Sequence, residues 1–338
     1  MPATVMCGPF KSLATQMCDR MAEGRIPGMT VAVLGLTEDR ILRGADAIPL
    51  AAPGEPPPVT RFAPSPTGYL HVGHAYSALF GFEAARSSGG RFLLRMEDID
   101  QQRCRAEFER AIFEDLSWLG LPWQGDVPRQ SDRIQLYAGA LERLRALGVV
   151  YPCFCTRKQI RIEVEHSGRA PHGPNDELIY PGICRGIAAD ESRRRIDNGE
   201  PFAWRLDNTK ALSITGELAW YDCRAGWIEA RPESLGDPIL ARKDTPTSYH
   251  LAVVVDDHLQ GVNLVTRGED LFHATHVHRL LQALLEITAP RYYHHNLVAD
   301  SRGERLAKRN RAITLRHLRD IGRTPADIWK MIGLKQHS

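Results

Sequence analysis

Long apolar runs are missing from this sequence. No segment reaches the roughly 18 consecutive apolar residues of a membrane-spanning helix, and the N-terminus lacks the charged, apolar and small-residue order of a secretory signal. An excess of one charge is also missing, because 43 basic and 41 acidic residues give a formal net charge of +2. Global charge therefore gives no argument for a polyanion partner, and we expect neither a membrane nor DNA to be bound.

The cysteines are unevenly spaced along the chain. The seven cysteines form an odd set, and nothing in the sequence suggests export. A disulfide framework is therefore not expected, and we interpret the chain as a protein of the reducing cytoplasm. In that setting, cysteines that lie close together more often bind a metal than form a disulfide.

The first 57 residues differ in their residue pattern from the rest of the chain. They lead into the run Ala51-Ala-Pro-Gly-Glu-Pro-Pro-Pro58, which continues neither a helix nor a central strand. Val31–Leu36 has the composition of a short strand, but the sequence offers it no core partner. We interpret residues 1–57 as a poorly ordered extension with a proline-rich linker at its end.

From Val59 onward the pattern alternates between strands and helices. Val59–Phe62 predicts a buried strand, a helix is expected from about His71 to Arg86, and Arg91–Met96 predicts a second strand. This order is typical of an α/β fold with a parallel sheet and right-handed crossovers. Further along, we predict helices over 103–119, 131–147 (with Ser131 as N-cap) and 270–286, and strands over 202–206, 219–222, 249–255 and 263–267.

The segment His71-Val-Gly-His74 stands where the first strand and its Pro/Gly turn lead into the first helix. A helix N-terminus presents unpaired N–H groups and a partial positive charge, which suit phosphate. Gly73 has no Cβ, so a flat base or a ribose can approach the backbone closely. His71 and His74 can donate hydrogen bonds to a phosphate chain as its charge grows during in-line attack. Two histidines at this spacing are by themselves a weak signal.

A second basic element, Arg305-Leu-Ala-Lys-Arg309, follows a turn that contains Gly303. It has the character of a loop that closes on a triphosphate. Taken alone, such a run is more often a solvated charged surface. Together, the two elements favour a nucleotide site.

Four segments resemble, in the same order, the class I aminoacyl-tRNA synthetases of the glutamyl/glutaminyl subgroup. The run Arg61-Phe-Ala-Pro-Ser-Pro-Thr-Gly-Tyr-Leu-His-Val-Gly-His74 is similar to the first signature of that subgroup, and Arg305–Arg309 to the second. Tyr249–Asp257 and Val265–Asp270 match the subgroup between them. The resemblance covers about residues 59–330 and implies ATP, bound with Mg²⁺, as a substrate. It implies catalytic roles for His71, His74 and Lys308, and ATP contacts from His71, Gly73, His74 and Lys308.

The resemblance also implies a domain organisation. A Rossmann-like, doubly wound parallel sheet is expected, with an inserted zinc-containing subdomain of the acceptor-binding type and a short helical C-terminal segment. Residues 58–150 and 236–300 would form the two halves of the catalytic domain, and 151–235 the RNA-contacting insertion. Residues 301–338 would hold the second signature loop and helices, without an anticodon-binding domain.

An L-glutamate substrate carries two carboxylates and one ammonium group. Its site therefore needs cations for the carboxylates and an anion for the ammonium. The positions that match the glutamate contacts of the subgroup are Arg61, Ser65, Glu97, Tyr249 and Arg267. The resemblance implies that the arginines hold carboxylates, that Glu97 takes the ammonium, and that Tyr249 and Ser65 supply neutral hydrogen bonds.

Cys153-Phe-Cys155 predicts two thiolates close together on a turn, with Cys184 further on and Tyr180 four residues before it. A Cys-x-Cys pair alone is more often a pair of buried free cysteines. Glutamyl-Q tRNA(Asp) synthetases, a short branch of the subgroup, carry Cys-x-Cys followed by Tyr-x-x-x-Cys in this insertion. That resemblance implies one structural zinc ion. The implied ligands are Cys153, Cys155, Tyr180 and Cys184. His166 and His172 stay open as alternatives to the unusual tyrosine.

Only about 29 residues follow Arg309, whereas long glutamyl-tRNA synthetases carry a large anticodon-binding part there. The resemblance is therefore strongest to the glutamyl-Q branch. It implies a monomer that activates glutamate with ATP without tRNA and then esterifies it onto the cyclopentene-diol of queuosine at position 34 of tRNA(Asp), with the anticodon arm of that tRNA as partner. Arg305 and Ala307 depart from the lysine and serine of the second signature, so we expect reduced but retained activity.

Three alternatives stay open. A truncated glutamyl-tRNA synthetase would charge a tRNA 3′ end and would need tRNA for activation. A nucleotidylyltransferase of the His-x-Gly-His type would be shorter and would lack the glutamate pocket. A non-catalytic RNA-binding relative is kept in view by Ala307, although the other implied catalytic and glutamate-binding residues are intact.

Overall fold

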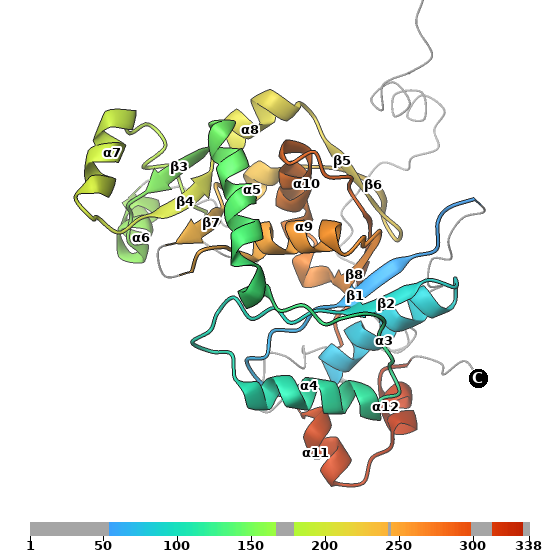
Figure 1. Cartoon of the computed structure of the whole chain (residues 1–338). Coiled ribbons are helices and arrows are strands. Elements are labelled where there is room, and N and C mark those ends of the chain that lie inside the picture. Colours follow the sequence, from blue (N-terminus) through green and yellow to red (C-terminus); the bar gives the residue numbers. More distant parts are fainter. Residues whose placement is uncertain (1–53, 167–178, 243–244, 299–312, 334–338) are drawn as a thin grey trace, which may run out of the picture. The chain divides into compact units, whose positions relative to one another are not determined.

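The computed structural model describes residues 54–166, 179–242, 245–298 and 313–333 (Figure 1). The possible strand Val31–Leu36 and the segment that holds Lys308 lie outside these residues. The described residues all belong to Glu38–Ser338, one of two units into which the chain divides. None of the helices in them combines the length and the apolar character that crossing a membrane would require.

A layer of mostly parallel strands forms the centre of the fold. Its strands are β1 (Val59–Phe62), β2 (Arg91–Leu94), β5 (Ala219–Asp222), β6 (Gly226–Glu229), β8 (Leu264–Gly268) and β9 (Arg291–His295). β1 pairs in parallel with β2, and β9 pairs in parallel with both β8 and β5. β1 and β8 meet where the Asn263 side chain accepts the Val59 N–H at 2.7 Å. The α/β prediction with parallel strands is confirmed.

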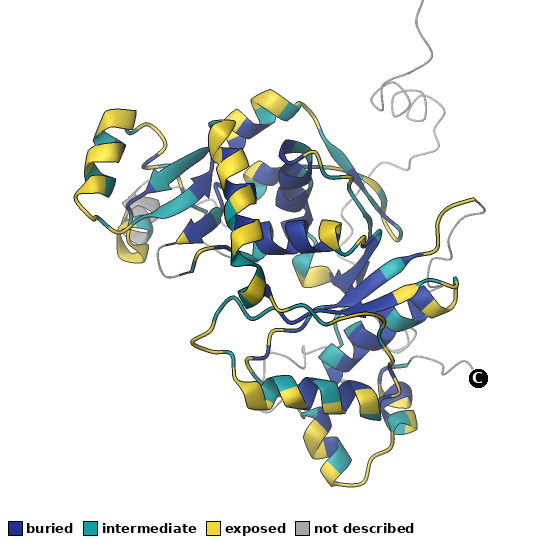
Figure 2. Ribbon diagram, in the orientation of Figure 1, coloured by how far each residue is buried: buried dark blue, intermediate teal, exposed yellow. Residues whose placement is uncertain are grey.

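Helices cover both faces of this layer (Figure 1). On one face lie α3 (Val72–Arg86), α4 (Ala106–Trp118), α11 (Leu315–Asp320) and α12 (Pro325–Met331). On the other lie α5 (Ile134–Ala146), α9 (Tyr249–Leu259) and α10 (Ala274–Leu284). Each face carries its own buried apolar cluster, one around Phe80 and Ile112 and the other around Leu251 and Leu280 (Figure 2). This arrangement buries the apolar side of every large helix.

Close packing fixes the position of α3. The Thr60 hydroxyl donates to the Gly81 carbonyl at 2.7 Å, and a Cβ added at Gly81 would lie 2.9 Å from the Thr266 hydroxyl oxygen. Glycine is therefore what lets α3 approach β1 and β8. Because β1 runs into the turn before α3, the N-terminus of α3 lies at the carboxyl ends of the strands, where such sheets bind ligands.

A separate antiparallel sheet lies beside this layer. Its strands are β3 (Val150–Cys153), β4 (Ala203–Leu206) and β7 (Ile239–Arg242). The short helices near it are α6 (Arg157–His166), α7 (Ala189–Asp197) and α8 (Asn208–Thr215). β7 extends this sheet beyond residue 235, while β5 belongs to the parallel layer. Strands on both sides of residue 235, where the sequence suggested that the inserted subdomain ends, therefore belong to each of the two sheets.

The predicted strand over 249–255 is wrong, because these residues begin the helix α9. Ser248 caps the helix by accepting the Leu251 N–H. Residues Leu251 to Val254 are all buried, since α9 packs between α5, α10 and β7. A continuous apolar run does not distinguish a strand from a helix that is buried on every side.

Two helix boundaries also differ from the prediction. Ser131 is not an N-cap, because it lies inside the 3₁₀ turn Gln130–Arg133 and donates its hydroxyl to Asp98 at 2.7 Å. The helix expected over 270–286 begins only at Ala274, after a separate 3₁₀ turn at Glu269–Leu271.

Candidate active site

A cavity of about 540 Å³ opens at the carboxyl ends of β1 and β8, beside the N-terminus of α3. It brings together every nucleotide or glutamate residue predicted from the sequence that lies in the described part of the chain. These residues are Arg61, Ser65, His71, Gly73, His74, Glu97, Tyr249 and Arg267. Lys308 lies outside the described residues. On either side of its segment, Val298 lines the cavity and Thr314 forms a backbone bridge with His71.

The two histidines cap α3 through the backbone. His71 Nδ1 accepts the Gly73 N–H at 3.1 Å, and His74 Nδ1 accepts the His71 N–H at 3.2 Å. Burial lowers the pKa of His71, and burial together with the nearby His71 lowers the pKa of His74 to about 3. Both rings are therefore neutral, and because Nδ1 is an acceptor, the proton of each ring sits on Nε2. Two neutral hydrogen-bond donors thus line the cavity.

Arg267 is a buried cation held by neutral groups. Its side chain donates to the Thr275 hydroxyl at 2.5 Å and to the Tyr249 hydroxyl at 3.2 Å, and His278 Nδ1 lies 3.3 Å away. Burial lowers the pKa of His278, so that ring carries no charge. Within the described residues no carboxylate forms an ion pair with Arg267. A buried guanidinium without a counter-charge is costly, so the cavity beside it suits an anion.

Arg61 is in a different state, because its charge is already partly compensated by a carboxylate that it shares with Arg95. Its Nε lies 3.0 Å from Asp257 Oδ1, and its Nη1 donates to the Thr266 carbonyl at 3.2 Å. Arg95 Nη1 lies 2.8 Å from the same Asp257 oxygen. The sequence placed the two arginines alike. The structure separates them, since only Arg267 lacks an acidic partner in the described residues.

Among the described residues, Glu97 is one of two acidic residues in the cavity wall, the other being Asp270. Its Oε1 accepts from Arg95 Nη2 at 2.9 Å. Burial nevertheless raises the pKa of Glu97, against the opposing attraction of Arg95 and Arg61. The carboxylate is therefore not fully compensated, and a cation in the cavity would stabilise its charged form.

The structure adds residues that the sequence analysis missed. Thr275, His278 and His294 contact Arg267, and His295 lies in the cavity wall with Nε2 3.0 Å from the Ser77 hydroxyl oxygen. Ser77 follows His74 by three positions, so helical spacing predicts that they share a face. The histidines on β9 gave no such signal, because that strand was not predicted.

Buried histidines make the fold sensitive to acid. Burial is the main cause of a pKa of about 3 at His74 and of about 4 at His250, His276, His294 and His295. In the unfolded chain their pKa is about 6.5, so stability is complete above that value and falls as the pH drops from about 6.5 towards 4. Each proton contributes up to about 1.4 kcal/mol per pH unit. We expect urea midpoints to change little between pH 7.5 and 6.5 and to fall clearly between pH 6.5 and 5.5, and a flat profile would contradict this.

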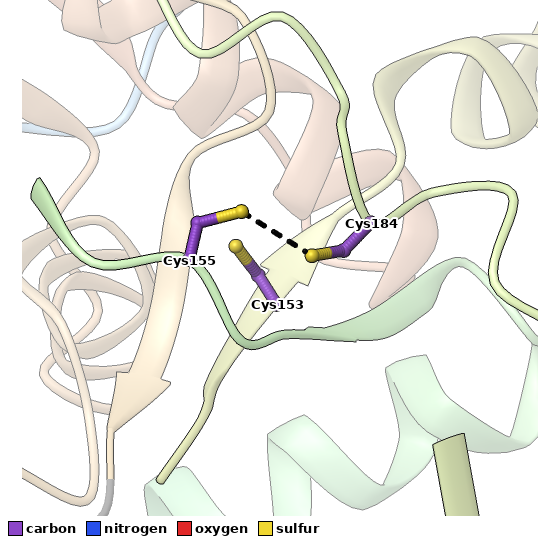
Figure 3. Close-up of side chains that lie close together, drawn as sticks. All are labelled: Cys153, Cys155 and Cys184. Atoms are coloured by element: carbon purple, nitrogen blue, oxygen red, sulfur yellow. Dashed lines mark hydrogen bonds between the residues drawn. The ribbon is translucent and has the colours of Figure 1, made fainter. Parts of the chain in front are cut away.

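A second candidate site lies in the antiparallel region. Cys153 ends β3, Cys155 follows it, and Cys184 comes from the segment before α7, with the three side chains pointing toward one another (Figure 3). Their sulfur atoms all lie within 4.8 Å of one another, and those of Cys155 and Cys184 are 3.4 Å apart. A tetrahedral ion with metal–sulfur distances of about 2.3 Å separates its sulfurs by about 3.8 Å. The three cysteines therefore fit a metal ion.

Tyr180 lies at the same place. Its hydroxyl oxygen is 3.3 Å from Cys153 Sγ and 3.9 Å from Cys155 Sγ, and it accepts the Cys184 N–H at 2.8 Å. The Arg205 guanidinium stacks on the Tyr180 ring, 3.8 Å from its centre, which adds positive charge beside the sulfurs. The side chains of His166 and His172 lie outside the described ones. Among the groups whose positions are known, Tyr180 is the one that fits a fourth ligand.

Comparison with known proteins gives a consistent picture. The family model for the catalytic domain of class I tRNA synthetases (E and Q) matches residues 58–336. A glutamyl-Q tRNA(Asp) synthetase from Rhodobacter capsulatus is 49% identical over 283 residues, covering 82% of this chain and 100% of that relative. A protein of the same name from Nitratidesulfovibrio vulgaris is 42% identical over 277 residues, covering 79% and 83%.

One solved structure adds a similarity in fold. The crystal structure of a glutamate tRNA ligase from Elizabethkingia meningosepticum, in complex with its amino acid, matches with a TM-score of 0.61 and 28% identity. The match covers 72% of this chain and 50% of that protein, so the chain spans about half the length of this solved relative.

Proposed function

This chain belongs to the class I tRNA synthetases of the glutamate and glutamine type, and within them to the glutamyl-Q tRNA(Asp) synthetases, and from this we propose that it activates L-glutamate with ATP without needing tRNA. It is a ligase of the aminoacyl-tRNA synthetase type with the α/β parallel-sheet fold of class I. The glutamyl group then passes to the cyclopentene-diol of queuosine at position 34 of tRNA(Asp).

The observation that carries the proposal is Arg267 in the cavity wall, which forms no ion pair with any carboxylate in the described part of the chain. The side-chain carboxylate of glutamate would supply the missing negative charge and would displace no existing ion pair. Glutamine would leave the guanidinium buried and unpaired, which is the physical basis for rejecting it. Tyr249, already in contact with Arg267 at 3.2 Å, offers a neutral hydrogen bond beside that carboxylate.

Glu97 completes the match to an amino acid. Its carboxylate needs a cation, and the glutamate ammonium is one. Arg267 would bind a negatively charged group of the ligand, and Glu97 would bind a positively charged group. A zwitterion with an acidic side chain carries both. Arg61, held by Asp257, would add electrostatic support to the α-carboxylate as a fixed, partly neutralised cation.

Activation needs the α-carboxylate to attack the α-phosphorus of ATP, with pyrophosphate leaving in line. The Nε2–H groups of His71 and His74 and the N-terminus of α3 would stabilise the charge that grows on the phosphoryl oxygens. Mg²⁺ bound with ATP would neutralise part of the phosphate charge. We propose Lys308 as a further phosphate contact, in keeping with the position of Val298 and Thr314 at the cavity.

Gly73→Ala tests the histidine pair. A Cβ at residue 73 would lie 2.9 Å from His71 Cε1 and 3.1 Å from His71 Nδ1, so the ring must move and its capping hydrogen bond is lost. We expect kcat for glutamate-dependent ATP–pyrophosphate exchange to fall about 100-fold, as for the loss of one oriented donor. Gly139→Ala, on α5 with no atom within 4 Å of the added Cβ, is the matched control. Equal rates in the two variants would contradict the role of His71.

The same exchange assay tests activation by the wild-type protein. With ATP, glutamate and no tRNA we expect exchange, at a rate reduced by the absence of the hydroxyl at Ala307. Lack of exchange without tRNA, followed by exchange on adding tRNA, would contradict tRNA-independent activation.

The acceptor is tested with radiolabelled glutamate. We expect label on tRNA(Asp) that carries queuosine and none on tRNA(Asp) that lacks it. Label on the 3′ end of tRNA(Glu) would instead support the alternative, a glutamyl-tRNA synthetase that charges a tRNA end. The 49% identity to a glutamyl-Q tRNA(Asp) synthetase over its whole length favours the first outcome.

We also propose a structural zinc ion held by Cys153, Cys155, Tyr180 and Cys184. Two features support it. The sulfur separations fit tetrahedral coordination, and the Tyr180 hydroxyl oxygen lies 3.3 Å from Cys153 Sγ and 3.9 Å from Cys155 Sγ. Thiolates so close together therefore need a cation. The ion would stiffen the antiparallel sheet rather than take part in the reaction.

A further inference from the structure

Behind Arg267, on the side away from the cavity, lie a histidine and a carboxylate. We propose that Asp222 and His294 are positioning residues for glutamate: Asp222 fixes the tautomer of His294, and His294 in that tautomer fixes the direction of Arg267. The inference rests on the proposed function only in naming glutamate as the ligand of Arg267.

The three groups form one hydrogen-bonded chain. Arg267 Nε donates to His294 Nε2 at 3.1 Å, and His294 Nδ1 lies 2.7 Å from Asp222 Oδ2. His294 is 3% exposed and Asp222 1% exposed, and neither lines the cavity. They therefore act on a ligand only through Arg267.

Chemistry fixes the protons along this chain. The Nε of arginine is a donor only, so His294 Nε2 must accept, and the single proton of the neutral ring must sit on Nδ1 and point to Asp222. Burial lowers the pKa of His294 to about 4 in spite of Asp222, so the ring is neutral. The Thr275 hydroxyl, 3.1 Å from His294 Nε2, accepts from Arg267 and can donate to the same nitrogen.

Hydrogen bonds from three backbone N–H groups hold the Asp222 carboxylate in a fixed orientation. Its Oδ1 accepts the N–H groups of Arg224 at 2.9 Å and Ala225 at 3.0 Å, and its Oδ2 accepts the N–H of His294 at 3.2 Å. These bonds use the turn after β5 and the pairing of β5 with β9 to orient the carboxylate. A group that only accepts, held in this way, permits only the Nδ1–H tautomer of His294.

Aromatic rings fix the plane of His294. Its ring centre lies 5.1 Å from that of Phe272, 5.6 Å from that of Trp220 and 5.9 Å from that of Tyr292. Because these aromatic rings surround the imidazole, it cannot rotate to compensate for the Nε2–H tautomer. That tautomer would place an N–H of His294 against the Nε–H of Arg267, and the guanidinium would have to turn away.

Asp222→Asn tests the proposal. The asparagine Oδ1 would keep the bonds to Arg224 and Ala225, the bond from the His294 backbone N–H would be lost, and the amide would donate to His294 Nδ1 and drive the proton to Nε2. We expect the KM for glutamate to rise about 10–100-fold, the range for loss of a group that orients a ligand-binding side chain, while the KM for ATP stays unchanged. ¹⁵N NMR of the histidine-labelled protein is expected to show His294 as the Nδ1–H tautomer in the wild type and as the Nε2–H tautomer in Asp222→Asn.

A double-mutant cycle separates positioning from a structural role. His294→Phe removes both ring nitrogens, so adding Asp222→Asn in that background is expected to raise the KM for glutamate no further. An equal additional rise would overturn the proposal, and so would an Nε2–H tautomer in the wild type. If the wild type shows no glutamate-dependent exchange, the proposed function fails, and the tautomers still decide whether Asp222 controls His294.

Discussion

Arg267→Gln is expected to lower kcat/KM for glutamate about 1,000-fold, mostly through KM. Removing one member of a buried, hydrogen-bonded charge pair costs about 2–5 kcal/mol, and about 4 kcal/mol corresponds to a factor of 1,000. The loss follows because Arg267, unlike Arg61, forms no ion pair with a carboxylate of the described residues and is free for the side-chain carboxylate, Arg61 being paired with Asp257 at 3.0 Å. Exchange kinetics at varied glutamate measure the effect.

Arg231→Gln is the matched control, since Arg231 is exposed and, within the described residues, its ion pair is with Glu229 on the surface at 3.0 Å. Its kinetics are expected to equal those of the wild type. The ratio of kcat/KM for glutamate to that for glutamine is expected to collapse in Arg267→Gln and to stay high in the control. A variant that kept the wild-type KM for glutamate would exclude Arg267 as the carboxylate partner.

Cys184→Ala is expected to lower the zinc content from about one ion per chain to near none. A structural zinc ion contributes about 10–16 kcal/mol of apparent binding free energy in small zinc domains at neutral pH, so losing a ligand also weakens the surrounding sheet. We expect a clear drop in the midpoint of thermal unfolding. Metal analysis by mass spectrometry and scanning calorimetry measure the two effects.

Two other free cysteines, Cys104 and Cys223, lie outside the cluster and provide the controls. Alanine at either position is expected to leave the zinc content unchanged. Tyr180→Phe tests the fourth ligand and is expected to weaken zinc retention against a chelator, whereas His172→Ala is expected to leave it as in the wild type. Full zinc in Cys184→Ala would show that the cluster is only a group of free thiols.

Local sequence patterns predicted the elements that carry the first signature. The apolar strand at β1, the Pro/Gly turn and the helix from His71 follow rules that act over a few residues. The same rules failed at α9, because the run from Leu251 to Val255 is apolar on every side and lacks a period. Ser248, the N-cap of that helix, was the one local signal that pointed to the correct answer.

The partners of the site residues could not be predicted in the same way. Resemblance named Arg61 and Arg267 as equals, and only the fold shows that Asp257, 196 positions away, neutralises the first of them. Asp222 and His294 are 72 positions apart and meet only because β5 and β9 are neighbours. Such pairings depend on strand order, which no short-range pattern encodes.

The junction of β1 with β8 has a consequence for how the chain reaches its native state. Val59 and Asn263 are 204 positions apart, so a chain leaving the ribosome exposes β1 and α3 long before their neighbouring strand has been made. Contacts of this length make folding slow, and the apolar surface of α3 must stay uncovered meanwhile, where it invites aggregation. A chain halted during synthesis before β8 would therefore hold both capping histidines and still lack the Arg267 side of the substrate cavity.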